Sequence, residues 1–280
     1  RPTRSRSRPK FCEGLSPKYR NNPKRSTMFC NDRFRKPYGN TLVPGMFLNI
    51  PVAATWAVRD AFPRALIFGT HGTKAGNLAA QNADYILSIG SRLDTKATSS
   101  PPSLFAPGAR LDMLDIDPAE IAKMARYGRP LNRELPFDCR DFFKVAGPLA
   151  AAMPPSETEE WTRTLAGWQL QHWPADSAPP PVGFHSPYAL IERLADALTG
   201  EEVIVSDTGN TLGVLMQAFR FKGQRFLHPF NNTPMGYGLP GALAAALETG
   251  RRVVCVTGDG SIMMAIGELA TIARHCQNVK

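Results

Sequence analysis

Gly258-Asp259-Gly260-Ser261 is the segment best suited to hold a charged ligand. It follows an apolar run typical of a strand and precedes an amphipathic run typical of a helix. Glycines let a backbone approach a ligand closely, and the first amides of a helix favour an anion. A carboxylate beside a diphosphate suits Mg²⁺, which proteins hold through one or two oxygens plus phosphate and water. A tight structural turn fits the same residues, so the motif alone leaves both interpretations open.

Two further segments are expected at the same place. Asp207-Thr208-Gly209-Asn210-Thr211 ends the preceding apolar strand, and Thr233–Gly241 lies between that strand and the glycine motif. Open α/β sheets bind ligands outside the carboxyl ends of their strands. We therefore expect the three segments to converge on one rim of a single sheet.

The elements that must position these loops alternate between strand and helix from Ile50 onward. This alternation predicts an α/β fold with two parallel-sheet, Rossmann-like domains. The apolar runs predict strands at 50–54, 85–91, 111–117, 202–206 and 252–257. The periodic segments predict helices at 56–62, 77–83, from 118 onward, within 137–153, and at 157–173, 188–198, 235–247 and 262–275.

Composition divides the chain into four parts. They are a basic tail (1–44), a central nucleotide-binding-like domain (45–153), a Pro-rich linker (154–187) and a second α/β domain (188–280). Residues 1–40 hold twelve Lys or Arg and two acids, a net charge of +10. The whole sequence carries +9, so the remaining residues together carry −1. We expect the tail to be disordered, because it offers little apolar surface to bury. Nucleic-acid binding by the tail ranks last, since it has few aromatic residues and no recognised motif.

The cysteines and the apolar runs indicate the cellular compartment of the protein. The chain has five cysteines and no C-x-x-C spacing, which argues against a disulfide framework or a zinc site. No run reaches the roughly 20 apolar residues that a membrane helix needs. The charged N-terminus has no apolar core behind it, unlike a secretory signal. We expect a cytoplasmic protein that does not enter a membrane.

Residues 188–280 resemble the diphosphate-binding domain of thiamine-diphosphate-dependent enzymes, in the acetolactate synthase group. The resemblance rests on Thr233–Ala246, Gly258–Met264 and Glu268–Ile272. It implies thiamine diphosphate and Mg²⁺ as cofactors, with Asp259 as metal ligand. Met235 matches the apolar residue beneath the thiazolium that keeps the cofactor bent, which is a catalytic role; a core methionine is the alternative. The implied cofactor-binding residues are Gly209, Asn210, Thr211, Met235, Gly258, Gly260 and Ser261.

The middle of the chain resembles the central domain of the same family. The matching segments are His71–Ala75, Ala83–Asp94 and Asp115–Ile121. In acetolactate synthases this domain holds FAD, whereas other relatives hold ADP or nothing. Direct pairing of Arg92 with Asp94 is a purely structural alternative. The residues implied for a flavin site are His71, Ser91, Arg92, Asp94 and Asp115.

The chain also departs from the family pattern. Ala265 stands where relatives usually have Asn, and the twenty residues after Gly260 are fewer than the family's metal motif needs to reach its second ligand, an Asn. No segment matches the domain that carries the activating glutamate. We therefore expect a C-terminally truncated fragment of a decarboxylase or carboligase for 2-keto acids such as pyruvate, inactive alone and a dimer or tetramer when full-length. A non-catalytic adenine-nucleotide-binding or assembly module is the alternative.

Overall fold

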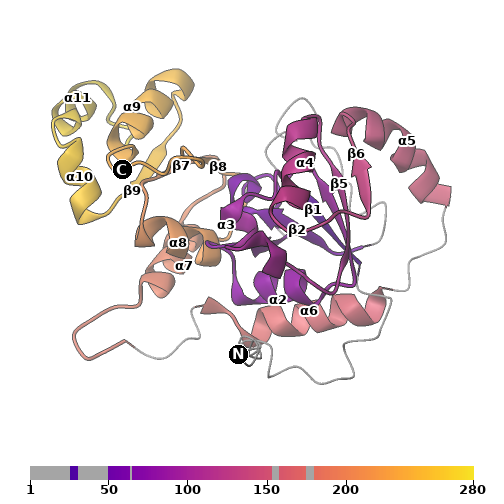
Figure 1. The fold of residues 1–280 in the computed structure, drawn as a ribbon. Helices are drawn as coiled ribbons and strands as arrows, with labels where there is room; N and C mark the ends of the chain where they lie inside the picture. The colour runs from indigo at the N-terminus through magenta and orange to yellow at the C-terminus, as the bar shows by residue number, and fades with distance from the viewer. Residues whose placement is uncertain (1–25, 31–49, 64, 153–157, 175–179) are drawn as a thin grey trace, which may run out of the picture.

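Two parallel sheets organise the part of the chain that the computed structural model describes, which is residues 26–30, 50–63, 65–152, 158–174 and 180–280 (Figure 1). We call the described residues up to 174 the N-unit and residues 180–280 the C-unit. Both sheets are flanked by helices, so the predicted α/β class with parallel sheets is confirmed.

The N-unit sheet has six strands in the order β3-β2-β1-β4-β5-β6, and every neighbouring pair is parallel. Parallel strands require crossover connections. Helix α2 lies in the connection from β3 to β4, and α4 lies in the connection from β5 to β6. The strands are β1 (Ser26–Cys30), β2 (Val52–Thr55), β3 (Leu66–Phe68), β4 (Tyr85–Ile89), β5 (Arg110–Leu114) and β6 (Arg133–Leu135).

Strand β1 corrects the prediction of disorder for five residues of the tail, Ser26–Cys30. It lies inside the basic segment, yet it pairs with β2 on one side and with β4 on the other. The sequence of this segment gives little indication of a strand. Its backbone amides and carbonyls nevertheless form hydrogen bonds to β2 and β4, and buried backbone polar groups need such partners. The remaining residues of the predicted tail lie outside the described ranges.

The helices of the N-unit begin where the sequence supplies caps. Thr73 accepts from the Gly76 amide, and Asp117 caps a helix that has Pro118 at its first position. The helices are η4 (Trp56–Val58, a 3₁₀ turn), α2 (Lys74–Asn82), α3 (Thr95–Thr98), η5 (Pro102–Leu104, 3₁₀), α4 (Pro118–Arg126), α5 (Cys139–Ala152) and α6 (Glu159–Gln171).

The C-unit sheet has the order β8-β7-β9, all parallel, and Val279 forms a further parallel bridge to Val253. Ser186 caps the first helix, as predicted. The elements are α7 (Pro187–Ala197), β7 (Val203–Ser206), α8 (Asn210–Ala218), β8 (Arg225–Leu227), α9 (Gly238–Thr249), β9 (Val253–Val256), α10 (Asp259–Met264) and α11 (Glu268–His275).

Two predicted helices differ from the observed ones. The segment 56–62 is helical only over η4, and the segment 262–275 is interrupted between α10 and α11. Gly267 lies at that interruption, and glycine is a poor residue for a helix interior. The break separates α10, which follows Gly258, from α11, and both helices contact α9.

One apolar cluster joins the two units. Trp56, Val58 and Phe62 of the N-unit belong to the same buried cluster as Leu215 and Phe219 of α8. Separate clusters fill the other face of the N-unit and the α9–α11 side of the C-unit. Within the described ranges, no helix is both long and apolar enough to cross a membrane.

Candidate functional site

The carboxylate of Asp207 organises the rim of the C-unit sheet. It follows β7 and is 1% exposed. One oxygen accepts from the Gly236 amide at 3.1 Å, and the other accepts from the Gly238 amide at 2.8 Å. The Thr208 amide also donates to it, at 2.9 Å. Charge-assisted bonds of this kind are stronger than neutral ones, so Asp207 fixes the loop before α9 to the end of β7.

The ends of β7 and β9 bring the other two loops together. Ser206 pairs with Val256 at the carboxyl edge, so the loops that follow these strands start side by side. Each loop leads through a glycine into a helix: Gly209 into α8 and Gly258 into α10. Gly209 has φ +84°, and a Cβ on either glycine would meet nothing within 4 Å. Glycine has no side chain to cover the first amides of α8 and α10. These amides are therefore accessible at the rim.

Met235 connects the loop before α9 with the start of α10. A Cβ on Gly260 would come within 3.1 Å of the Met235 methyl carbon, and one on Gly236 within 3.0 Å of Met264 Cβ. The Met235 side chain is 46% exposed, so it overhangs the rim and is not a core residue. The sequence-based alternative of a core methionine is therefore wrong.

The three predicted segments thus converge on one edge of one sheet. Asp259 is exposed at the first position of α10, and Asn210 is exposed at the first position of α8. Ser261 is buried beneath the rim, and the Thr211 hydroxyl donates to the Thr208 carbonyl at 3.0 Å. Among the described side chains, no group of three or more His, Cys, Asp or Glu is arranged to hold a metal. A cation here would depend on Asp259 together with oxygens of its ligand.

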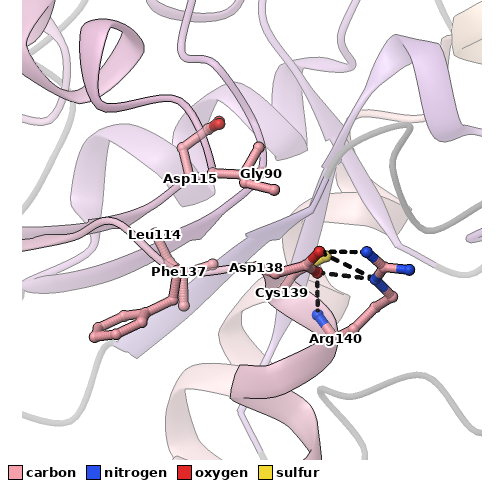
Figure 2. A pocket seen from close by; sticks show the side chains of 8 residues that line it. Gly90, Leu114, Asp115, Phe137, Asp138, Cys139 and Arg140 are labelled. Carbon is pink, nitrogen blue, oxygen red and sulfur yellow. Dashed lines mark hydrogen bonds and ion pairs between the residues drawn. The ribbon is translucent and has the colours of Figure 1, made fainter.

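A pocket of about 260 Å³ opens at the carboxyl edge of the N-unit sheet (Figure 2). Gly90 follows β4, and Asp115 follows β5. The Asp115 carboxylate is 1% exposed and accepts from the Asp117 amide at 3.0 Å. The lining residues are Gly90, Leu114, Asp115, Ile116, Phe137, Asp138, Cys139 and Arg140.

Asp138 and Arg140 form an ion pair at the pocket, with 2.6 Å between the nearest oxygen and nitrogen. Hydrogen bonds from the Arg140 side chain and amide lower the pKa of Asp138 far below its usual value. Burial, and then the charge of Asp138, raise the pKa of the Cys139 thiol. This thiol is therefore protonated at neutral pH and is not set up as a nucleophile.

Comparison with known proteins decides the family. Residues 207–280 match the family description "Thiamine pyrophosphate enzyme, C-terminal TPP binding domain". Residues 47–133 match "Thiamine pyrophosphate enzyme, central domain". The chain belongs to the thiamine pyrophosphate enzymes.

The chain is also similar to curated acetolactate synthase large subunits. The isozyme 3 large subunit of acetolactate synthase from Escherichia coli is 30% identical over 236 residues, which covers 81% of this chain and 40% of the relative. The isozyme 1 large subunit from the same organism is 32% identical over 224 residues, covering 79% and 38%. A probable acetolactate synthase large subunit from Methanocaldococcus jannaschii is 30% identical over 240 residues, covering 82% and 40%. The chain thus spans about 40% of the length of such relatives.

The residues implied for a flavin site have different contacts in the structure. Only Asp115 lines the pocket, next to Gly90. Ser91 is buried, and its hydroxyl has no hydrogen-bond partner within the described ranges. Asp94 caps α3 by accepting from the Ala97 amide at 3.0 Å.

Arg92 and His71 point to other partners. Arg92 pairs with Glu120 at 3.1 Å rather than with Asp94, so the structural alternative of an Arg92–Asp94 pair is wrong. His71 lies between the units: its ring is 4.6 Å from that of Trp56, and a Cβ on Gly213 of α8 would be 3.7 Å from its Nδ1. Burial, with a smaller effect of Lys96, lowers the pKa of His71.

A cluster of aromatic rings and cations at the junction of the units was not predicted from the sequence. His228 is 6% exposed and lies against the rings of Trp56, Phe230 and Tyr237. Neither of its ring nitrogens has a hydrogen-bond partner in the described part of the chain. Burial, and then His71, lower its pKa to about 4, so the ring is neutral near pH 7. No motif marks this histidine; only its position directly after an apolar strand could have drawn attention to it.

Proposed function

We propose that the C-unit binds the diphosphate of thiamine diphosphate together with Mg²⁺, in a protein that decarboxylates a 2-keto acid such as pyruvate. The observation that carries the proposal is the meeting of three glycine-containing loops at one sheet edge, with Asp207 holding two of them together. Open glycine amides suit phosphate oxygens, and the carboxyl edge of an open α/β sheet is the usual place for such a ligand.

The residues at the rim fit this pair of ligands. Gly209 and Gly258 leave space where a side chain would stand, and Asp259 is an exposed carboxylate beside them. Asp259 would hold the cation, while the amides and side chains at Gly209, Asn210, Thr211, Gly260 and Ser261 would contact the diphosphate. An Mg²⁺ ion bound through a single carboxylate completes its shell with phosphate oxygens and water.

Met235 would support the thiazolium side of the cofactor. Its exposed thioether projects over Gly260, next to the proposed diphosphate position. Methionine is apolar and adaptable, so it can hold a ring without competing for hydrogen bonds. When bound, the cofactor supplies an electron sink for decarboxylation.

The nature of the relatives supports catalysis over a purely structural role. Those described above are named acetolactate synthases. We therefore favour a 2-keto acid decarboxylase or carboligase, acting as a homo-oligomer in the cytoplasm, over a non-catalytic module. That residues 1–280 alone form no acetolactate from pyruvate stays a prediction, checked by assaying the purified chain with cofactor and Mg²⁺.

Ligand-induced stabilisation tests the cofactor proposal. We expect thiamine diphosphate with Mg²⁺ to raise the Tm of the chain, because a ligand present at about 100 times its Kd adds roughly 2.7 kcal/mol of stability. Asp259→Asn should weaken this binding at least tenfold in Mg²⁺ and change little when Mg²⁺ is chelated. Glu248→Gln, at an exposed acid near the end of α9, is the matched control. An unchanged Tm of the unsubstituted chain at millimolar cofactor would refute the proposal.

We also propose that the pocket at Asp115 takes the ribose of an adenine nucleotide, ADP or the adenosine half of FAD. A buried acid at a strand end suits ribose hydroxyls, and Asp115 stands directly after β5. ADP should raise the Tm of the chain, and Asp115→Asn should reduce that shift. A shift with FAD but none with ADP would instead favour contacts to the flavin ring.

A further inference from the structure

The ammonium group of Lys96 reaches from the N-unit into the loop that carries Met235. Lys96 lies in α3, and its Nζ is within hydrogen-bond distance of three oxygens of residues 230–233. They are the carbonyls of Phe230 (3.4 Å) and Asn231 (3.2 Å) and the hydroxyl of Thr233 (3.4 Å). An ammonium group has three N–H donors and no acceptor, so one side chain can satisfy all three oxygens.

Lys96 is itself held firmly. Its carbonyl accepts from the Thr70 amide at 2.7 Å and the Thr70 hydroxyl at 3.1 Å, and Asp94 caps its helix. The ammonium also lies 5.1 Å from the centre of the Trp56 ring, a cation–π distance. These contacts all lie within the N-unit, so the N-unit fixes the position from which Nζ contacts the C-unit loop.

The loop that it contacts has an unfavourable backbone. Thr233 has φ +45°, in the left-handed region that a β-branched residue seldom adopts. Such a conformation is strained and persists only where surrounding contacts determine it. Here the Thr233 amide donates to the Pro229 carbonyl at 3.0 Å, and its hydroxyl accepts from Lys96.

Met235 lies between two anchors. Two residues before it, Lys96 holds Thr233; one residue after it, Asp207 holds the Gly236 amide. We propose that Lys96 is a positioning residue, which keeps Met235 over Gly260 through its bonds to residues 230–233. The proposal rests on the proposed cofactor site and adds that the N-unit sets the geometry of its thiazolium side.

Two ligands separate this role from general stability. Inorganic pyrophosphate with Mg²⁺ would occupy only the diphosphate position, whereas thiamine diphosphate also needs Met235. We expect Lys96→Met to weaken thiamine diphosphate about tenfold, with the Kd of pyrophosphate changed less than twofold, both by titration calorimetry on the full chain. Lys96→Arg should recover most of the loss, because it restores the cation. Lys144→Met, at an exposed lysine of α5, should change neither constant.

Each outcome of these titrations supports or contradicts the proposed role of Lys96. An equal loss of affinity for both ligands would mean a general structural role and would overturn the proposal, as would unchanged affinity for thiamine diphosphate. Failure of the unsubstituted chain to bind either ligand would overturn the proposed cofactor site as well. If Lys96→Met does not fold, Lys96→Arg and Lys96→Gln replace it. Weakened thiamine diphosphate binding in Gln but not in Arg would support the role, and equal binding in both would contradict it.

Discussion

At the residue scale, the carboxylate of Asp207 alone binds three backbone amides at the rim. Both oxygens accept backbone amides, and the group is almost fully buried. Thr208 lies just after β7, whereas Gly236 lies in the loop before α9 and Gly238 begins that helix. The sequence predicted that this segment lies at the rim but gave Asp207 no role, although an acid at the end of a parallel strand was a usable signal.

We predict that Asp207→Asn destabilises the chain by about 3 kcal/mol, because hydrogen bonds to a buried charge contribute more than neutral ones and the amide would turn an NH₂ toward a donor. Urea unfolding at pH 7.5 measures this change. Asp138→Asn, which removes one partner of a partly exposed ion pair, should cost under about 1 kcal/mol. Equal effects of the two substitutions would contradict the assigned role of Asp207.

His228 should make the fold sensitive to acid. The unfolded imidazole binds a proton near pH 6.5, whereas burial and the nearby His71 hold the folded pKa at about 4. Unfolding therefore takes up a proton between these values, and stability falls as the pH drops through this range. The expected loss between pH 7.5 and pH 5 is about 2 kcal/mol.

This dependence can be assigned by substitution. His228→Phe keeps a ring against Phe226 and Tyr237 but cannot be protonated. We expect urea midpoints of this variant to change much less between pH 7.5 and pH 5 than those of the unsubstituted chain. Equal slopes in the two proteins would show that other groups account for the acid sensitivity.

At the scale of elements, α2 lies unusually close to β3. A Cβ on Gly76 would fall 2.0 Å from the Ile67 carbonyl oxygen, and one on Gly72 would fall 2.5 Å from the same atom. Only glycine allows this approach of helix to strand. The approach brings the loop before α2, including His71, to the junction with α8.

We predict that Gly76→Ala costs about 3 kcal/mol, the upper end for overpacking, since the backbone of β3 must move. Gly167→Ala in α6 is the matched change, because nothing lies within 4 Å of its Cβ position. It should stabilise the chain by up to about 1 kcal/mol through helix propensity. Thermal unfolding of both variants checks the opposite signs; a loss of stability in both would contradict the packing argument.

At the scale of the whole molecule, the units share their core and several hydrogen bonds. Gln217 of α8 donates to the Gly72 carbonyl at 3.1 Å, and the Phe226 amide donates to the Asp60 carboxylate at 2.9 Å. Buried residues of both units form one apolar cluster. A junction of this kind couples the stability of one unit to that of the other.

We therefore predict that the chain unfolds in a single transition. All four tryptophans, at 56, 161, 168 and 173, belong to the N-unit, and two of them also contact the C-unit, Trp56 through His228 and Trp173 through Glu192. Tryptophan fluorescence therefore follows the N-unit and its junction with the C-unit. Far-UV circular dichroism follows both units. The two signals should give the same urea midpoint within error. A second transition seen only by circular dichroism would show that the units unfold independently.

The sequence by itself determined the local features of this protein. Strand–helix alternation predicted the parallel α/β fold, and Ser186 and Pro118 marked two helix starts correctly. The loops at 207–211, 233–241 and 258–261 were recognisable because strand ends, glycines and acids lie close together in the chain. Such signals need only a few neighbouring residues.

Only the tertiary structure decided features that depend on distant partners. Ser26–Cys30 becomes a strand because β2 and β4 both pair with it, although its basic surroundings predicted disorder. Lys96 meets Thr233 across 137 residues, and Arg92 meets Glu120 rather than Asp94. Long-range pairings depend on how the whole chain packs, so they cannot be predicted from a few neighbouring residues.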